Sequence, residues 1–205
     1  MKACAIWGTP VKDKRKEGDK TYFDSARAGG EYCISGTAST VIDVWCKKTK
    51  INLTTWLVNQ RRLGTCCPEI TGTILEEVER YRPLSVHDRA DNLLRYLFSK
   101  SDILGKVISF CLDTDYSCKD TAHNELLAWT SSGCQISEVL TLSEYCHEEK
   151  WINLEKKPVT TSSGSSCYEL MLKSNGYARL AYLNGINPQS DQALEMAQGK
   201  NNKNK

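Results

Sequence analysis

Apolar residues recur every three or four positions between residues 85 and 98, and this is the clearest pattern in the chain. Such spacing places the apolar side chains on one face of an α-helix. Ser85, with Asp88 three residues later, resembles a capping box, and Pro83 lies where a helix is about to start. The sequence therefore predicts an amphipathic helix over residues 85–98. Its apolar face consists of Ala90, Leu93, Leu94, Leu97 and Phe98.

The preceding part of the chain shows shorter patterns, β-prone at first and helical later. Short β-prone pieces separated by charged or glycine-containing turns predict a small β-rich knuckle over residues 1–40, which is too small to be stable alone. Residues 41–83 are predicted to be a helical linker. Asn52 is expected to cap one of its helices. The β-prone pieces are 4–7, 21–23 and 32–34, and the expected helices are 37–48, 53–63 and 73–80.

The chain after the central helix alternates between strand-like and helix-like stretches. The predicted order of elements is helix, helix, turn, helix, strand, long loop and strand, which is typical of a winged helix-turn-helix. We expect this domain over residues 84–185, with an added C-terminal helix. Residues 186–205 are polar and are expected to be disordered. The predicted fold class is α+β. The expected strands are 105–110, 151–154 and 168–172, and the expected helices are 124–129, 136–146 and 177–183.

The charge of the chain does not indicate a globally basic surface. The net charge is +2, but three of the 27 basic residues lie in the tail after residue 199, which leaves 24 against 25 acidic residues. A local basic cluster falls on the predicted helix pair, and it is a candidate nucleic-acid-binding surface. A solvated helix face is the alternative interpretation. The cluster consists of Lys47, Lys48, Lys50, Arg61 and Arg62.

The third helix of the predicted winged helix is acidic. In a DNA-binding domain of this kind that helix usually lies in the major groove. Its carboxylates would be repelled by phosphates, and phosphate neutralisation dominates DNA affinity. The sequence thus favours a protein contact or self-association here. The candidate partner-binding residues are Glu138, Glu144 and Glu148.

Motifs that carry catalysis or hold metals are missing from the sequence. The three histidines lie in different predicted elements, and there is no glycine-rich phosphate loop, Gly-x-Ser-x-Gly or His-Glu-x-x-His. The ten cysteines are scattered without a Cys-x-x-Cys pair, so we interpret them as reduced, packed thiols. We therefore expect no enzyme activity, no cofactor and no metal.

The sequence predicts no membrane association. No apolar run reaches the length of a membrane span, and the first residues lack the apolar core of a signal peptide. The expected location is cytoplasmic.

Several phrases of the sequence resemble a family of bacterial proteins suspected to serve in anti-phage defence. The resemblance implies an N-terminal module that in relatives precedes an effector domain similar to TIR or nucleoside deoxyribosyltransferase folds. Here the chain ends in a Lys-Asn tail, so only the sensing or scaffolding half is expected. The phrases are residues 6–10, 24–32, 56–62, 89–97 and 176–180, with residues 190–194 resembling the junction to the effector.

The resemblance also bears on the N-terminal knuckle. Some relatives carry cysteine pairs there that resemble a zinc ribbon. In this chain Cys4 remains, Trp7 stands where a second cysteine would, and Ala28-Gly29-Gly30 replaces the other pair. The resemblance thus implies a degenerate zinc-ribbon-like knuckle without zinc, held by the packing of Trp7, Tyr22 and Tyr32.

Together these observations predict a non-enzymatic regulatory or adaptor protein. It would recognise a protein partner through the winged helix, as a sensor component of anti-phage defence. The partner would be a separately encoded effector or a second copy. The alternative is a nucleic-acid-binding regulator that uses the basic helix pair 47–62.

Overall fold

The computed structural model describes residues 2–41, 46–112, 121–133, 136–158 and 166–185. The fold is mixed α+β, with an N-terminal sheet and seven α-helices among the described residues. The chain divides into two compact units. The N-terminal unit contains the described residues of 1–85 and 115–135, and the C-terminal unit contains those of 86–114 and 136–205. The predicted disordered tail, 186–205, lies outside the described residues.

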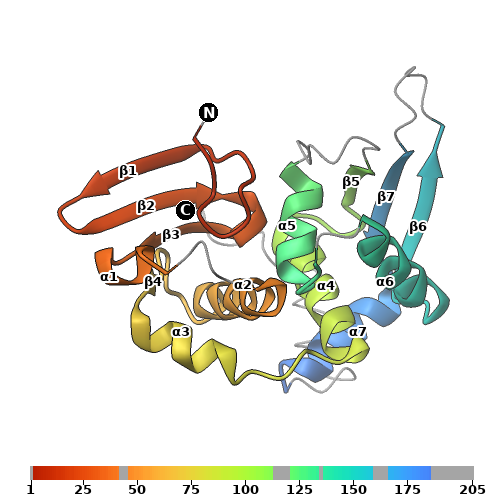
Figure 1. The fold of residues 1–205 in the computed structure, drawn as a ribbon. Coiled ribbons are helices and arrows are strands. Elements are labelled where there is room, and N and C mark those ends of the chain that lie inside the picture. Colours follow the sequence, from red (N-terminus) through yellow and green to blue (C-terminus); the bar gives the residue numbers. More distant parts are fainter. Residues whose placement is uncertain (1, 42–45, 113–120, 134–135, 159–165, 186–205) are drawn as a thin grey trace, which may run out of the picture. The chain divides into compact units, whose positions relative to one another are not determined.

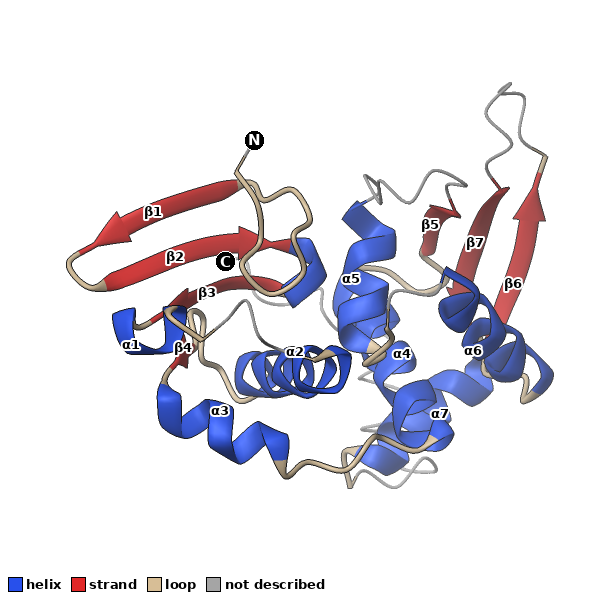
Figure 2. Ribbon diagram, viewed as in Figure 1, coloured by secondary structure: helices blue, strands red, loops and turns tan. Residues whose placement is uncertain are grey.

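The N-terminal unit is a four-stranded sheet covered by helices (Figures 1 and 2). The strand order is β1-β2-β3-β4, with β4 parallel to β3 and the other pairs antiparallel. The helix α5 belongs to this unit through its packing on η1 and α2. The elements are β1 (Asp13–Glu17), β2 (Lys20–Ser25), η1 (Ala26–Ala28), β3 (Gly30–Ile34), α1 (Gly36–Ser39), α2 (Lys47–Arg62), β4 (Glu69–Ile70), α3 (Gly72–Glu79) and α5 (Thr121–Trp129).

The core of this unit lies between the sheet and the helices α2 and α3. Tyr32 is fully buried and stacks on Phe23, with ring centroids 5.3 Å apart. Among the described residues no group of three or more His, Cys, Asp or Glu side chains could hold a metal ion. The core consists of Cys4, Ile6, Phe23, Ala28, Tyr32, Ile34, Ala38, Leu53, Trp56, Leu57, Ile70, Leu75 and Val78.

The strand expected over residues 4–7 is wrong. The chain makes an isolated bridge between Ala3 and Pro10 and a tight turn, in which the Gly8 amide donates to the Cys4 carbonyl. Gly8 adopts a positive φ of 69° and closes this turn, in which residues 5–7 lie. Cys4 and Ile6 are buried in this loop, and their burial explains the apolar pattern that resembled a strand.

The expected boundary between two helices at Asn52 is also wrong, because α2 runs continuously through it. The Asn52 side chain is 4% exposed, and its Nδ2 donates to the Val78 carbonyl at 2.8 Å and the Tyr81 carbonyl at 3.3 Å. These carbonyls lie at and just beyond the end of α3, where helix carbonyls lack partners. Asn52 thus satisfies the end of another helix and does not cap its own.

The C-terminal unit packs helices against a second sheet. The strand order is β5-β7-β6, and both pairs are antiparallel. The amphipathic helix predicted over 85–98 is confirmed as α4, which buries Ala90, Leu93, Leu94 and Leu97. The elements are α4 (Val86–Lys100), β5 (Val107–Leu112), α6 (Ile136–Glu148), β6 (Ile152–Lys157), β7 (Ser166–Leu172) and α7 (Ser174–Leu183).

Covalent and ionic links add to the packing of the C-terminal unit. Cys111 of β5 and Cys167 of β7 face each other in the register and form a disulfide, so the expectation of reduced thiols is wrong for this pair. The Arg179 guanidinium donates to both carboxylate oxygens of Asp91, at 2.9 and 3.0 Å. The Asp91 side chain is buried, and this paired geometry satisfies its charge.

Candidate functional site

The five basic residues predicted as a nucleic-acid-binding cluster lie at the two ends of α2. Lys47, Lys48 and Lys50 are in its first turn, and Arg61 and Arg62 are in its last. Because a helix rises 1.5 Å per residue, Lys50 and Arg61 are about 16 Å apart along the axis. The structure therefore does not bring the five side chains together in one patch.

Arg61 serves the internal structure of the N-terminal unit. Its Nη1 donates to the Ala28 carbonyl at 2.9 Å, and its Nη2 donates to the Glu31 carbonyl at 2.6 Å. Burial lowers the pKa of Arg61 to about 10. The guanidinium packs against Gly29, where a side chain would also meet Val58. Arg61 thus holds the turn between η1 and β3.

The remaining basic residues of the cluster are more exposed. Lys47, Lys48 and Arg62 are exposed, and the Arg62 Nη1 donates to Asn59 Oδ1 at 3.2 Å. The first turn of α2 contains no acidic residue, so the lysine charges add to the positive end of the helix dipole. Lys47 and Lys48 at one end of α2 and Arg62 at the other are the parts of the predicted basic surface that are exposed.

The acidic helix α6 presents one exposed stripe. Positions 137, 141, 144 and 148 recur at helical spacing and are exposed, whereas Val139, Leu142 and Cys146 on the opposite face are buried. The exposed residues are Ser137, Thr141, Glu144 and Glu148. The stripe contains two carboxylates four residues apart and no basic residue.

Glu138 differs from the other two acidic candidates. Its Oε2 accepts a hydrogen bond from Arg89 Nη2 at 3.1 Å, and both side chains are about three-quarters buried. This ion pair joins α6 to α4 within the C-terminal unit. Glu138 therefore acts in the internal structure, and Glu144 and Glu148 remain as surface candidates.

The three histidines occupy separate environments. His87 Nδ1 lies 2.9 Å from the Tyr145 hydroxyl, and His147 Nδ1 accepts a hydrogen bond from the Leu154 amide at 3.1 Å. His123 is 1% exposed in α5. The hydrogen bonds of His87 and His147 thus join elements within the C-terminal unit.

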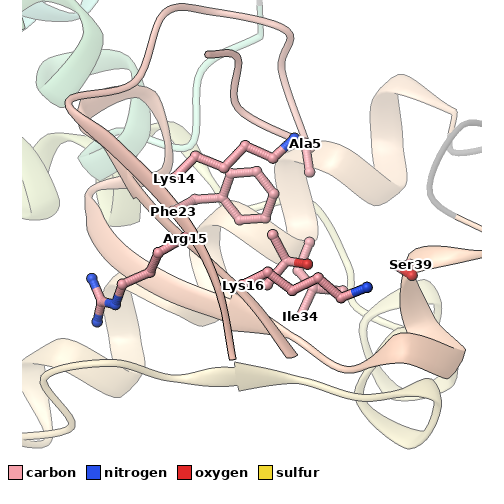
Figure 3. Close-up of a pocket in the computed structure, with 8 residues that line it drawn as sticks. Ala5, Lys14, Arg15, Lys16, Phe23, Ile34 and Ser39 are labelled. Carbon is pink, nitrogen blue, oxygen red and sulfur yellow. The ribbon is translucent and has the colours of Figure 1, made fainter. Parts of the chain in front are cut away.

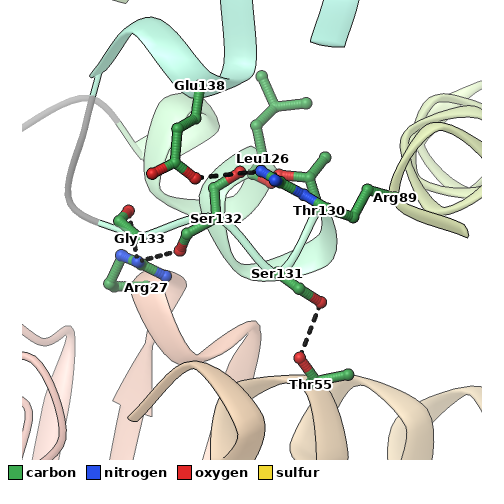
Figure 4. A network of polar contacts seen from close by, with 9 residues as sticks. All are labelled: Arg27, Thr55, Arg89, Leu126, Thr130, Ser131, Ser132, Gly133 and Glu138. Carbon is green, nitrogen blue, oxygen red and sulfur yellow. Dashed lines mark hydrogen bonds and ion pairs between the residues drawn. The ribbon is translucent and has the colours of Figure 1, made fainter. Parts of the chain in front are cut away.

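A buried arginine that sequence reasoning did not single out lies in η1 (Figure 4). Arg27 is 3% exposed, and its Nη2 donates to the carbonyls of Ser132 at 2.8 Å and Gly133 at 3.0 Å. Its guanidinium also lies over the Trp7 ring, 3.8 Å from the centroid. Through these hydrogen bonds Arg27 links η1 to residues 132 and 133, which follow α5. No local signal predicts this role, because the partners are about 105 residues away.

Hydroxyl groups complete the same buried polar network. Thr55 Oγ1 and Ser131 Oγ are hydrogen-bonded at 2.7 Å, and Thr130 Oγ1 and Ser132 Oγ are also 2.7 Å apart. Figure 4 shows these contacts, together with the Arg89 and Glu138 pair of the C-terminal unit. The network consists of buried hydroxyls, Arg27 Nη2 and backbone carbonyls that are hydrogen-bonded to one another, which is typical of a structural core.

Comparisons with known proteins give no identification. No protein-family model matches the chain, and no curated protein or solved structure is significantly similar to it. The resemblance to the anti-phage-defence family therefore stays a prediction. In the described ranges, no helix is both long and apolar enough to cross a membrane.

Proposed function

We propose that this chain is a non-enzymatic regulatory or adaptor protein that recognises a protein partner through the exposed stripe of α6. The observation that carries the proposal is the composition of that stripe, which combines Glu144 and Glu148 with two hydroxyl residues. Carboxylates and hydroxyls suit a partner surface that supplies arginine, lysine or backbone amides. A role as a sensor component in bacterial anti-phage defence is part of the proposal and rests on the sequence resemblance.

The order of elements supports a winged-helix arrangement for this recognition surface. From α4 to β7 the order is helix, strand, helix, helix, strand, strand, and the sheet order β5-β7-β6 places the last strand between the other two. Both features are typical of winged helices. By its order in the sequence α5 is the second helix of this arrangement. It packs, however, on η1 and α2 of the N-terminal unit. The helix in the usual reader position is α6.

Electrostatics favour a protein over duplex DNA as the partner of α6. A reader helix brings its exposed stripe close to phosphates, and each phosphate contact normally uses a lysine or arginine. The α6 stripe contains two carboxylates and no cation. Contact with a duplex through this helix would therefore place like charges together.

Nucleic-acid binding through α2 is the second candidate. The observation that favours it is the group Lys47, Lys48 and Lys50 at the positive end of a 16-residue helix. Arg61 and Arg62 lie at the other end of α2, so they do not add positive charge next to the lysines. This candidate therefore predicts modest, strongly salt-dependent binding that does not depend on sequence.

Fluorescence anisotropy with labelled single- and double-stranded DNA and RNA separates the two candidates. We expect no binding at low salt, where charge interactions are least screened. Binding at low salt that is lost on increasing salt, and that disappears in the variant Lys47→Gln/Lys48→Gln/Lys50→Gln, would replace the first candidate by the second. The variant Glu76→Gln/Glu79→Gln on α3, where both carboxylates are exposed, is the control for general charge effects.

A further inference from the structure

The edge of the N-terminal sheet carries a pocket that the proposed function does not use. Its volume is about 450 Å³, which lies within the range of small-molecule sites. Figure 3 shows its walls, which come from β1, β2, β3, the N-terminal loop and α1. The lining residues are Ala5, Lys14, Arg15, Lys16, Thr21, Phe23, Ile34 and Ser39.

The pleat of β1 aims two lysines at this pocket. Side chains two residues apart lie on the same face of a strand, so Lys14 and Lys16 share a face. In the register Lys14 is opposite Phe23, and Lys16 is opposite Thr21. Both lysines therefore stand beside the apolar floor that Phe23 and Ile34 provide (Figure 3).

Arg15, between the two lysines, points the other way. Its Nη2 lies 2.7 Å from Glu31 Oε1, and its Nε lies 3.1 Å from Glu17 Oε1. Its guanidinium also lies over the Tyr22 ring, 4.6 Å from the centroid. These contacts, and the orientation in Figure 3, assign the arginine to the opposite face of the sheet. Asp13 and Glu17, the acidic residues next to the lysines in sequence, thus already pair with Lys2 or Arg15.

The two lysine charges have no carboxylate partner among the described residues. Lys14 lies over the Phe23 ring, 5.3 Å from the centroid, and neither ammonium forms an ion pair in the part of the chain that the structure describes. Lys14 and Lys16 are both exposed, so two positive charges stand accessible at the rim of an apolar hollow. An anion in the pocket would neutralise both.

We propose that this pocket binds a small organic phosphate of about the size of a mononucleotide. A phosphate monoester carries a charge of roughly −1.5 to −2 at neutral pH, which matches two ammonium groups. Lys14 and Lys16 hold the phosphate, and the Thr21 hydroxyl lies on the same strand face to donate a further hydrogen bond. Phe23, Ile34 and Ala5 contact the organic body.

Isothermal titration calorimetry of the full chain with AMP, adenosine and inorganic phosphate tests the proposal. AMP is expected to bind with a measurable heat at low salt. Adenosine, which lacks the phosphate, is expected to bind at least about tenfold more weakly, since one charge-assisted hydrogen bond is worth about this factor. Inorganic phosphate is also expected to bind more weakly than AMP, because it leaves the apolar floor uncovered.

Two double variants with the same change in net charge localise the site. Lys14→Gln/Lys16→Gln is expected to weaken AMP binding by about tenfold or more. Lys150→Gln/Lys156→Gln, which removes two exposed lysines of the C-terminal unit, is expected to leave AMP affinity unchanged. Circular dichroism of both variants checks that they are folded.

Three results would overturn the proposal. The first is the absence of AMP binding to the wild-type chain. The second is an equal loss of affinity in both double variants, which would indicate unspecific attraction. The third is unchanged AMP affinity in Lys14→Gln/Lys16→Gln. Increased self-association of that variant would then indicate that the two lysines prevent strand pairing between molecules at this edge strand.

Discussion

Arg61 and Arg62 are adjacent in the sequence and occupy different environments in the structure. Arg61 donates to two backbone carbonyls and is largely enclosed, whereas Arg62 is exposed and donates to Asn59 Oδ1. Sequence reasoning placed both in one basic surface. The difference between the two arginines arises because Arg61 binds the carbonyls of residues 28 and 31. These residues lie about 30 positions away in the sequence, so no local pattern predicts the difference.

Substitution of these two arginines should separate the structural role from the surface role. Arg61→Gln is expected to lower the free energy of unfolding by about 2 kcal/mol, because it removes charge-assisted hydrogen bonds to buried carbonyls. Arg62→Gln is expected to change it by less than about 0.5 kcal/mol. Urea denaturation followed by circular dichroism measures both. Equal effects of the two substitutions would contradict the structural assignment of Arg61.

Cysteine reactivity is a second property set at the residue scale. Cys46 is exposed, and hydrogen bonds from the Thr49 hydroxyl and then from backbone amides lower the pKa of its thiol. Burial raises the pKa of Cys146 to about 12. A lower pKa gives more thiolate at a given pH, and the thiolate is the form that reacts.

Alkylation with iodoacetamide near pH 7 should therefore modify Cys46 well before Cys146 in the folded chain. As the pH rises, the rate at Cys46 should level off below the pH at which an ordinary thiol does, because its pKa is lowered. Thr49→Ala should raise that pKa and slow the reaction at neutral pH. Peptide mass spectrometry follows the labelling. Modification of Cys146 at the same rate as Cys46 would contradict the described burial.

At the scale of elements, hydrophobic periodicity predicts a helix well when only one of its faces is buried. It does not predict the bounds of a helix that is buried on several faces. The stripe over 85–98 gave α4 directly. In α2 the residues from Asn52 to Val58 are all buried, so the sequence shows no one-sided apolar pattern there. The cap-like residue Asn52 therefore suggests a helix start where the structure has none. The disulfide between β5 and β7 could not be predicted either, because its residues are 56 positions apart.

Close packing at the start of α7 makes a prediction about Gly176. A side-chain carbon added there would meet the Trp151 carbonyl oxygen and Leu172, so Gly176→Ala forces α7 away from the sheet. The expected loss in the free energy of unfolding is about 1–3 kcal/mol. In contrast, Gly72→Ala in α3 has open space and is expected to be neutral or stabilising by up to about 1 kcal/mol. Thermal unfolding of both variants compares them, and a Gly176→Ala protein as stable as the wild type would contradict this packing.

At the scale of the whole molecule, the assignment of α5 could not be derived from the order of elements. In sequence α5 falls inside the predicted winged-helix range 84–185, yet its packing on η1 and α2 places it in the N-terminal unit. The reason is the buried polar network, in which Arg27 and Thr55 bind residues 131–133. The exposure of Glu144 and Glu148, in contrast, follows from local helical spacing, whereas the pairing of Glu138 with Arg89 depends on a residue 49 positions away.

The central claim is that the exposed stripe of α6 contacts a protein partner, and site-specific photo-crosslinking in the host cell tests it most directly. A photoreactive p-benzoyl-phenylalanine in place of Thr141 lies within the stripe, and the same group in place of the exposed Thr73 of α3 is the control. We expect a defined protein crosslink from position 141 only, and its loss in the background of Glu144→Lys/Glu148→Lys. Identical crosslinks from both positions, or a crosslink from position 141 to nucleic acid, would contradict the account.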